Sequence, residues 1–168
     1  FHYIPAGSAK LVDVRSVMLM TVDQSGDTLT CVSGIGPGIS NRIGSKFSRD
    51  RGLLGEAFTS REPVINNQPD PKDPLLSISA IEGIGAVNNL LILPLTAQNH
   101  VAGLLIFINK QNGQNFTEDD VSTLEGFTNQ AAIAMSNVLL YEQTDRALEQ
   151  RIEELSLMQS IDRKLHSS

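Results

Sequence analysis

The chain has 168 residues, 40% of them apolar and 19% charged, a balance that is ordinary for a globular domain with a buried core. A net charge of -6 and a pI near 5.0 weigh against a nucleic-acid partner, because a phosphate backbone requires a clustered basic face on the protein. The longest apolar runs are too short to span a bilayer and no secretory leader opens the chain, so we expect no membrane insertion and a cytoplasmic location.

Residues that carry catalysis or bind metal are sparse. The single cysteine, Cys31, excludes an internal disulfide and a cysteine-built zinc site. It lies in the alternating stretch TLTCVSG, a pattern that indicates a strand and favours a small buried side chain at this position. The three histidines have no metal-ligand spacing, and neither G-x-S-x-G nor a P-loop occurs. We therefore predict no catalytic residue, no metal site and no enzymatic activity in this segment.

The first part of the chain predicts a hairpin. Pro5 and Gly7 argue against a helix at the N-terminus, within residues 1–7. Alternating apolar residues predict strands at 16–22 and 28–33, joined by the turn DQSGD, in which glycine can adopt a positive φ.

The middle of the chain predicts short elements. Three glycines and a proline indicate an exposed loop at 34–41, and 42–47 reads as a short strand. The stretch 50–60 predicts a tight turn followed by a short helix, whose first backbone amides could bind an anion or a ring carbonyl. An equally good interpretation is that its glycines only allow close packing. Residues 63–66 predict an edge strand.

A loop is predicted at 67–74, because three prolines in six residues exclude regular structure. Residues 75–85 predict a marginal helix of low stability. The aliphatic runs at 88–95 and 101–110 predict an antiparallel pair of buried strands.

A long helix is predicted from Thr117 to the end of the chain. Thr117 is the expected N-cap, and three acids follow it where the helix dipole favours negative charge. In residues 141–168 an apolar seam continues through Leu148, Ile152 and Leu155, and its phase then shifts. We expect this seam to pair with a second copy of the chain; the alternative is a linker helix that packs back on its own domain.

Together these segments resemble the GAF domain, a small-molecule-binding regulatory module. The strings that carry the resemblance are RSVMLMTVDQSGDTLTCVSGIG, DRGLLGEAFTSREPVINN and LILPLTAQNHVAGLLIFINKQNGQNFTEDDVSTLEGFTNQAAIAMSNVLLY, which cover residues 14–141 in the family's order. The resemblance implies an α/β (α+β) fold of the GAF/PAS type, in which a central antiparallel sheet of five or six strands has helices packed on one face and a short helix and lid on the ligand side. The lid corresponds to residues 75–85, which we expect to be ordered mainly when a ligand fills the site beneath them. It further implies a sensory domain at 1–141, with a short or truncated N-terminal helix, and a signalling or coiled-coil helix at 142–168.

The resemblance also implies a ligand site. Residues of this chain that match the family's pocket are Ser16, Val32, Ser33, Leu53, Leu54, Leu76 and Ser77. Cyclic-nucleotide-binding members tend to have aromatic residues at the positions of Val32 and Leu76; the aliphatic side chains here weigh against purine stacking.

A second motif resembles the N-K-F-D signature of cyclic-nucleotide-binding members. Its residues are Asn109, Lys110, Phe116 and Asp120, and Val121 replaces the final glutamate. Because Lys110 ends a strand and Asp120 begins a helix, we expect an ion pair that braces the two elements.

The functional prediction is a ligand-sensing regulatory domain of a multidomain signal-transduction protein, such as a two-component sensor histidine kinase or a nucleotide cyclase. Its expected partners are a small molecule, a second copy bound through the C-terminal helix, and a covalently linked effector domain. One alternative is a ligand-free dimerisation scaffold, and a further one is a cyclic-nucleotide-binding domain. No cofactor is required by the sequence. The resemblance offers bilin attachment at Cys31 as the alternative to a small buried side chain, but the residues weigh against bilin and haem.

Overall fold

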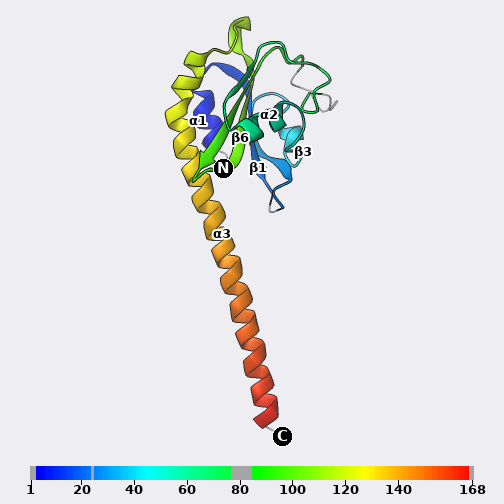
Figure 1. Cartoon of the computed structure of the whole chain (residues 1–168), viewed down its shortest axis with the longest axis vertical. Helices are drawn as coiled ribbons and strands as arrows, with labels where there is room; N and C mark the ends of the chain where they lie inside the picture. The colour runs from blue at the N-terminus through cyan, green and yellow to red at the C-terminus, as the bar shows by residue number, and fades with distance from the viewer. Residues whose placement is uncertain (1–2, 24, 77–84, 167–168) are drawn as a thin grey trace. The chain divides into compact units, whose positions relative to one another are not determined.

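The computed structural model describes the backbone of residues 3–23, 25–76 and 85–166, and in the last helix the side chains of 118–138 and 147–155 (Figure 1). The chain divides into two units, Phe1–Ile133 and Ala134–Ser168, which are described separately. Most of the predicted lid, residues 77–84, lies outside the described residues.

The first unit is built on one antiparallel sheet. Its strands are β1 (Val14–Val22), β2 (Thr28–Ile35), β3 (Lys46–Ser48), β4 (Val64–Asn66), β5 (Leu90–Ala97) and β6 (His100–Lys110). They form a six-stranded sheet in the order β3-β2-β1-β6-β5-β4, in which every pair of neighbours is antiparallel. Strands β1, β6 and β5 are neighbours in the sheet, because their aliphatic runs can be buried on both faces. The predicted fold class is confirmed.

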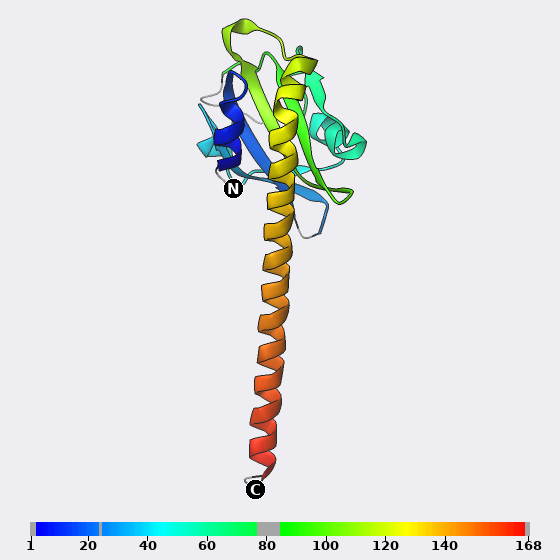
Figure 2. The same ribbon diagram turned by 90° about the vertical axis from the view of Figure 1, so that its left-hand side faces the viewer.

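The two faces of the sheet carry different layers. Met18 of β1 lies opposite Ile106 of β6, and both belong to a buried cluster with Leu54 and Ala57 of helix α2 (Gly52–Ser60). On the opposite face, helix α1 (Tyr3–Ala9) and the first turns of helix α3 (Glu118–His166) lie side by side over the sheet (Figure 2). Successive side chains of β1 and β6 point to opposite faces of the sheet, so both strands contribute to the buried layer on each face.

Helix α1 corrects the prediction that residues 1–7 are not helical. Pro5 lies in the first turn, where a backbone N–H has no acceptor within the helix, so the missing donor costs nothing. Gly7 lies against α3: a Cβ at this position would come within 2.8 Å of the Phe127 ring. Gly7, which disfavours a helix in isolation, therefore allows α1 to pack closely on α3.

The segment after β2 also differs from its prediction as an exposed loop and a strand from residue 42. A 3-10 helix, η1 (Ser40–Arg42), follows, and β3 begins only at Lys46. Ile39 and Arg42 are 1% and 2% exposed, so this segment contributes to the core. Gly34 permits the approach, because a Cβ there would come within 2.2 Å of the Ile39 side chain.

Helix α3 is continuous from Glu118 to His166, as the sequence predicted. The carboxylate of Asp120 accepts a hydrogen bond from the backbone N–H of Thr117 at 2.9 Å, which closes the first turn. Within the described part of the chain, no helix is both long enough and apolar enough to cross a membrane.

Candidate functional site

Of the predicted ligand-binding residues, three lie together on the α2 side of the sheet. Leu54 and Leu76 are members of the buried cluster there, and Leu53 packs against it half-buried. Ser16 is fully buried, and its hydroxyl donates to the carbonyl of Pro37 at 3.2 Å. Ser77 lies outside the described residues.

Val32 and Ser33 are placed by a β-bulge. The register passes from Leu19 opposite Ser33 to Met20 opposite Cys31, so Val32 is the extra residue of β2. Val32 is 37% exposed. Ser33 is buried opposite Leu19, which is not part of the cluster on the α2 side. Neither Val32 nor Ser33 therefore belongs to the buried cluster that contains Leu54.

Arg42 is the only charged residue that is buried among the described residues. Its Nη1 donates to the carbonyl of Leu75 at 3.4 Å, which ties η1 to the segment after α2. Burial lowers the pKa of the guanidinium, and the nearby Cys31 acts in the opposite direction.

Cys31 is fully buried in the same layer, and its thiol donates to the carbonyl of Ser33 at 3.8 Å. Burial raises the pKa of the thiol, an effect opposed by that hydrogen bond and by the charge of Arg42. A neutral, buried thiol has little nucleophilic character, so Cys31 packs as a small buried side chain and has no reactive role in this arrangement.

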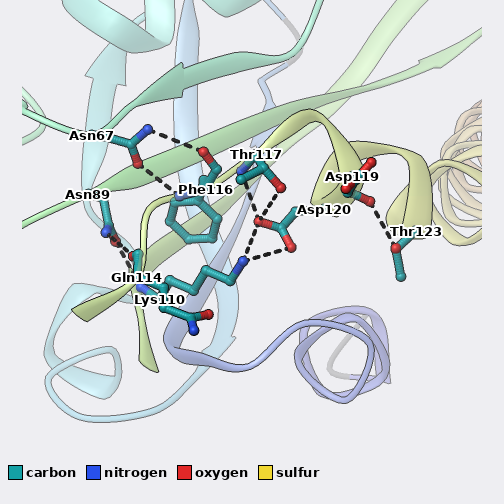
Figure 3. Close-up of polar contacts among 9 residues, drawn as sticks. All are labelled: Asn67, Asn89, Lys110, Gln114, Phe116, Thr117, Asp119, Asp120 and Thr123. Atoms are coloured by element: carbon teal, nitrogen blue, oxygen red, sulfur yellow. Dashed lines mark hydrogen bonds and ion pairs between the residues drawn. The ribbon is translucent and has the colours of Figure 1, made fainter. Parts of the chain in front are cut away.

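Lys110 and Asp120 connect the end of β6 to the first turn of α3 (Figure 3). The Lys110 Nζ lies 3.0 and 2.8 Å from the two carboxylate oxygens of Asp120, and the side chains are only 14% and 13% exposed. The same carboxylate accepts from the backbone N–H of Thr117. One acidic side chain thus caps the helix and fastens it to the sheet.

Three asparagine side chains reinforce this end of the sheet. Asn109, with a φ of 61°, accepts from the N–H of Asn88 at 2.7 Å and donates to the carbonyl of Ala86 at 2.9 Å. The remaining two act in the same way. Asn89 bonds the N–H of Lys110 and the carbonyl of Gln114, and Asn67 bonds both backbone groups of Phe116 (Figure 3). These amides hold three chain segments in fixed positions.

Cavities open on the described part of the first unit beside α2 and beside the end of β6. The first, of about 340 Å³, lies beside the C-terminus of α2, where the guanidinium of Arg49 stacks over Phe58 at 5.4 Å. The second, of about 370 Å³, lies beside the Lys110–Asp120 pair and is called here the amide pocket. Its lining residues are Arg15, Asn67, Asn88, Asn89, Asn109, Lys110, Gln111, Asn112, Gly113 and Asn115.

Neither Arg42 nor the amide pocket was predicted from the sequence. Burial of an arginine in a short irregular segment leaves no periodic signal, so Arg42 could not have been found from pattern alone. The amide pocket did leave a signal: paired asparagines stand at 66–67 and 88–89, and further ones at 109, 112 and 115. Asparagine at strand ends is typical of residues that bond neighbouring backbone groups.

Comparisons with known proteins agree on one family. A family model described as a GAF domain matches residues 8–136. No curated protein matches the chain. Among solved structures, the second GAF domain of DevS from Mycobacterium smegmatis is 22% identical, with a TM-score of 0.70, over 86% of this chain and 96% of that one.

Two further structures show the same fold in other contexts. The GAF domain of a two-component sensor histidine kinase from Bacillus halodurans is 22% identical, with a TM-score of 0.66, over 83% of this chain and 96% of that one. The GAF domain of a phosphoenolpyruvate-protein phosphotransferase from Coxiella burnetii is 14% identical, with a TM-score of 0.71, over 84% and 83% of the two chains.

Proposed function

The chain belongs to the GAF domain family, whose members are regulatory modules, and on that premise we propose that it is the ligand-sensing domain of a multidomain signalling protein. A small molecule binds on the α2 side of the sheet, and α3 passes the bound state to a covalently linked effector of the histidine kinase or cyclase type. The helix does so as part of a homodimer.

The continuity of α3 is the observation that carries this proposal. Its first turn is held to β6 by the Lys110–Asp120 pair, so a displacement of the sheet acts directly on the helix. Farther along, Leu148, Ile152 and Leu155 are 54%, 62% and 54% exposed, at intervals of four and three residues. An apolar seam with this spacing is typical of a coiled coil and is buried when two helices pair.

The proposed ligand site is the one that Ser16, Leu53, Leu54, Leu76 and Ser77 line in the family's arrangement. Val32 and Ser33 match the same pocket in sequence, but neither belongs to the buried cluster on the α2 side. The described residues of this layer are mostly aliphatic, which favours an apolar or weakly polar molecule. A cyclic nucleotide is the next candidate, although no aromatic residue occupies the two positions that would stack on its purine.

A ligand-free dimerisation scaffold is the second candidate function. It is favoured by the tight filling of the α2 side, where Met18, Leu29, Ile92 and Ile106 are each at most 1% exposed. In this case the domain would only hold two effectors in register, and no small molecule would change its stability.

Ligand binding separates the two candidates. Purified protein is titrated with cyclic AMP, cyclic GMP and a set of apolar metabolites while its thermal unfolding is followed. A sensor gives a midpoint that rises with the concentration of one compound, because a ligand that binds only the folded state stabilises it by mass action. A midpoint unchanged by every compound supports the scaffold instead.

The dimer is tested by sedimentation. The chain should sediment as a dimer, and the double variant Ile152→Glu with Leu155→Glu should sediment as a monomer, because charges in the seam oppose pairing. The matched control is Glu153→Gln, which changes an exposed residue beside the seam and should leave the dimer intact. A monomeric parent chain, or a double variant that remains dimeric, would contradict pairing through α3.

A further inference from the structure

The lining of the amide pocket differs in charge from the rest of the chain. The chain as a whole carries a net charge of -6, yet among the described residues the pocket lining contains no aspartate or glutamate. It contains the cations Arg15 and Lys110, the second of which is paired with Asp120 beside the pocket. A concave surface lined by cations and neutral amides concentrates anions, because field lines are focused between walls of low dielectric. Its volume of about 370 Å³ is ample for a small anion.

The backbone of the pocket wall adds further hydrogen-bond donors. The 3-10 helix η3 (Gln111–Gly113) contains Asn112 in the left-handed conformation, with φ 64° and ψ 22°, and Gly113 follows with φ 67°. A change from right- to left-handed residues in such a turn points successive backbone N–H groups toward one side, an arrangement that binds anions. The exposed side-chain amides of Asn112 and Asn115 lie on the same wall.

The wall is also rigid. The side chains of Asn89 and Asn109 are buried, at 4% and 7% exposed, and each bonds backbone groups of neighbouring segments. The backbone segments that carry the pocket lining are therefore held in place before a ligand arrives, which reduces the entropy cost of binding.

From these observations we infer that the amide pocket binds a small phosphate-type oxyanion, either inorganic phosphate or the phosphoryl group of a small ester. Arg15 supplies a planar guanidinium, which suits two oxygens of a tetrahedral anion. The donors of η3 are the backbone N–H groups of Asn112 and Gly113, because the N–H of Gln111 donates to the carbonyl of Asp13 at 2.8 Å. Neither the pocket nor these residues belong to the proposed ligand site on the α2 side of the sheet.

Binding in this pocket acts on α3 through Lys110. The ammonium lines the pocket and at the same time pairs with Asp120 in the first turn of the helix. A bound oxyanion competes with the carboxylate for this one cation, so the brace weakens when the pocket is filled. By linkage, removal of the Asp120 charge must strengthen the binding of the anion.

The test is a titration of the full chain with inorganic phosphate and with glycerol 3-phosphate, at constant ionic strength, with glycerol as the neutral control. Calorimetry measures affinity, and amide NMR signals report the location. We expect saturable binding that shifts the signals of Asn112 and Gly113. Tighter binding of the ester identifies a phosphorylated metabolite as the ligand class, whereas equal or weaker binding identifies free phosphate.

Variants distinguish this site from general attraction. Arg15→Gln should weaken binding about tenfold or more, the loss expected for a charge-assisted hydrogen bond. The matched control, Arg61→Gln, removes the same charge from the other cavity and should leave the affinity unchanged. Asp120→Asn should strengthen binding severalfold, an effect that a merely structural role of the carboxylate does not produce.

Three results would overturn the inference. One is the absence of saturable binding by either phosphate compound. The second is an equal loss of affinity in Arg15→Gln and Arg61→Gln, and the third is unchanged or weaker binding in Asp120→Asn that still folds. None of these results bears on the thermal-shift test of the proposed sensor, because that test concerns another site.

Discussion

The Lys110–Asp120 pair should contribute measurably to stability, unlike most ion pairs at protein surfaces. Both side chains are under 15% exposed, and both carboxylate oxygens lie within 3.0 Å of the ammonium. Solvent and salt therefore screen the pair only partly. We expect a coupling energy of about 1.5–3 kcal/mol, the range for hydrogen bonds to charged groups, instead of the about 0.2–1 kcal/mol of exposed pairs.

A double-mutant cycle measures this coupling. Urea unfolding is followed for the parent chain, Lys110→Met, Asp120→Asn and the double variant. Any change that Asp120→Asn makes in the hydrogen bond from the Thr117 N–H occurs with and without Lys110, so it cancels in the cycle. The Arg49–Asp50 pair is the internal control, because its N–O distance is 3.7 Å and its side chains are 38% and 76% exposed. Its coupling should be at most about 0.5 kcal/mol.

The coupling energies of the Lys110–Asp120 and Arg49–Asp50 pairs are then compared. If the coupling of the brace is no larger than that of the exposed control pair, then burial and bidentate geometry do not strengthen this contact, and the mechanical link from β6 to α3 loses its support.

Three further predictions concern packing and pH. Gly7→Ala should destabilise the fold by about 1–3 kcal/mol, because the added Cβ would lie 2.8 Å from the Phe127 ring. Gly126→Ala, whose Cβ meets open space in α3, should stabilise the fold by about 0.5–1 kcal/mol. If urea unfolding gives the reverse order, the packing of α1 on α3 is contradicted. Leu104→Ala should cost about 2–5 kcal/mol in the same assay, since Leu104 is fully buried, and a loss below about 1 kcal/mol would exclude it from the core. Burial raises the pKa of Cys31, so the thiol ionises more readily in the unfolded chain. The contribution of Cys31 to the free energy of unfolding is therefore intact below the unfolded pKa of about 8.5 and declines as pH rises toward the folded pKa. The stability difference between the parent chain and Cys31→Ala should therefore shrink between about pH 8 and about pH 10, and a constant difference would show that the folded thiol titrates normally.

Local patterns predicted much of this fold because they report burial directly. The run LLIFIN requires a strand that is covered on both faces, and Ile106 and Phe107 lie in opposite layers of the sheet. Thr117 followed by three acids predicted the start of α3 at residue 118, since capping depends on neighbours in the chain. The family resemblance rested on the same runs in the same order, and the match to the GAF domain confirms it.

The failures have a common physical cause. Pro5 and Gly7 disfavour a helix when only neighbouring residues are considered, but the helix forms because it docks on Phe127, more than a hundred residues away. Arg42 was expected at the start of a strand, yet it is buried in a short turn beside Leu75. Long-range packing can override local preference, and a single sequence carries no measure of it.

The sequence by itself determined which stretches form strands and helices, the family to which the chain belongs, and the identity of the pair that braces β6 to α3. Only the tertiary structure decided which residues share a cavity. Arg15, Asn89 and Gly113 lie on separate segments, and the antiparallel register of β1, β5 and β6 brings their ends together. A pocket depends on where chain segments meet in space, whereas a motif depends only on neighbours in the chain, so the amide pocket could be recognised only after folding.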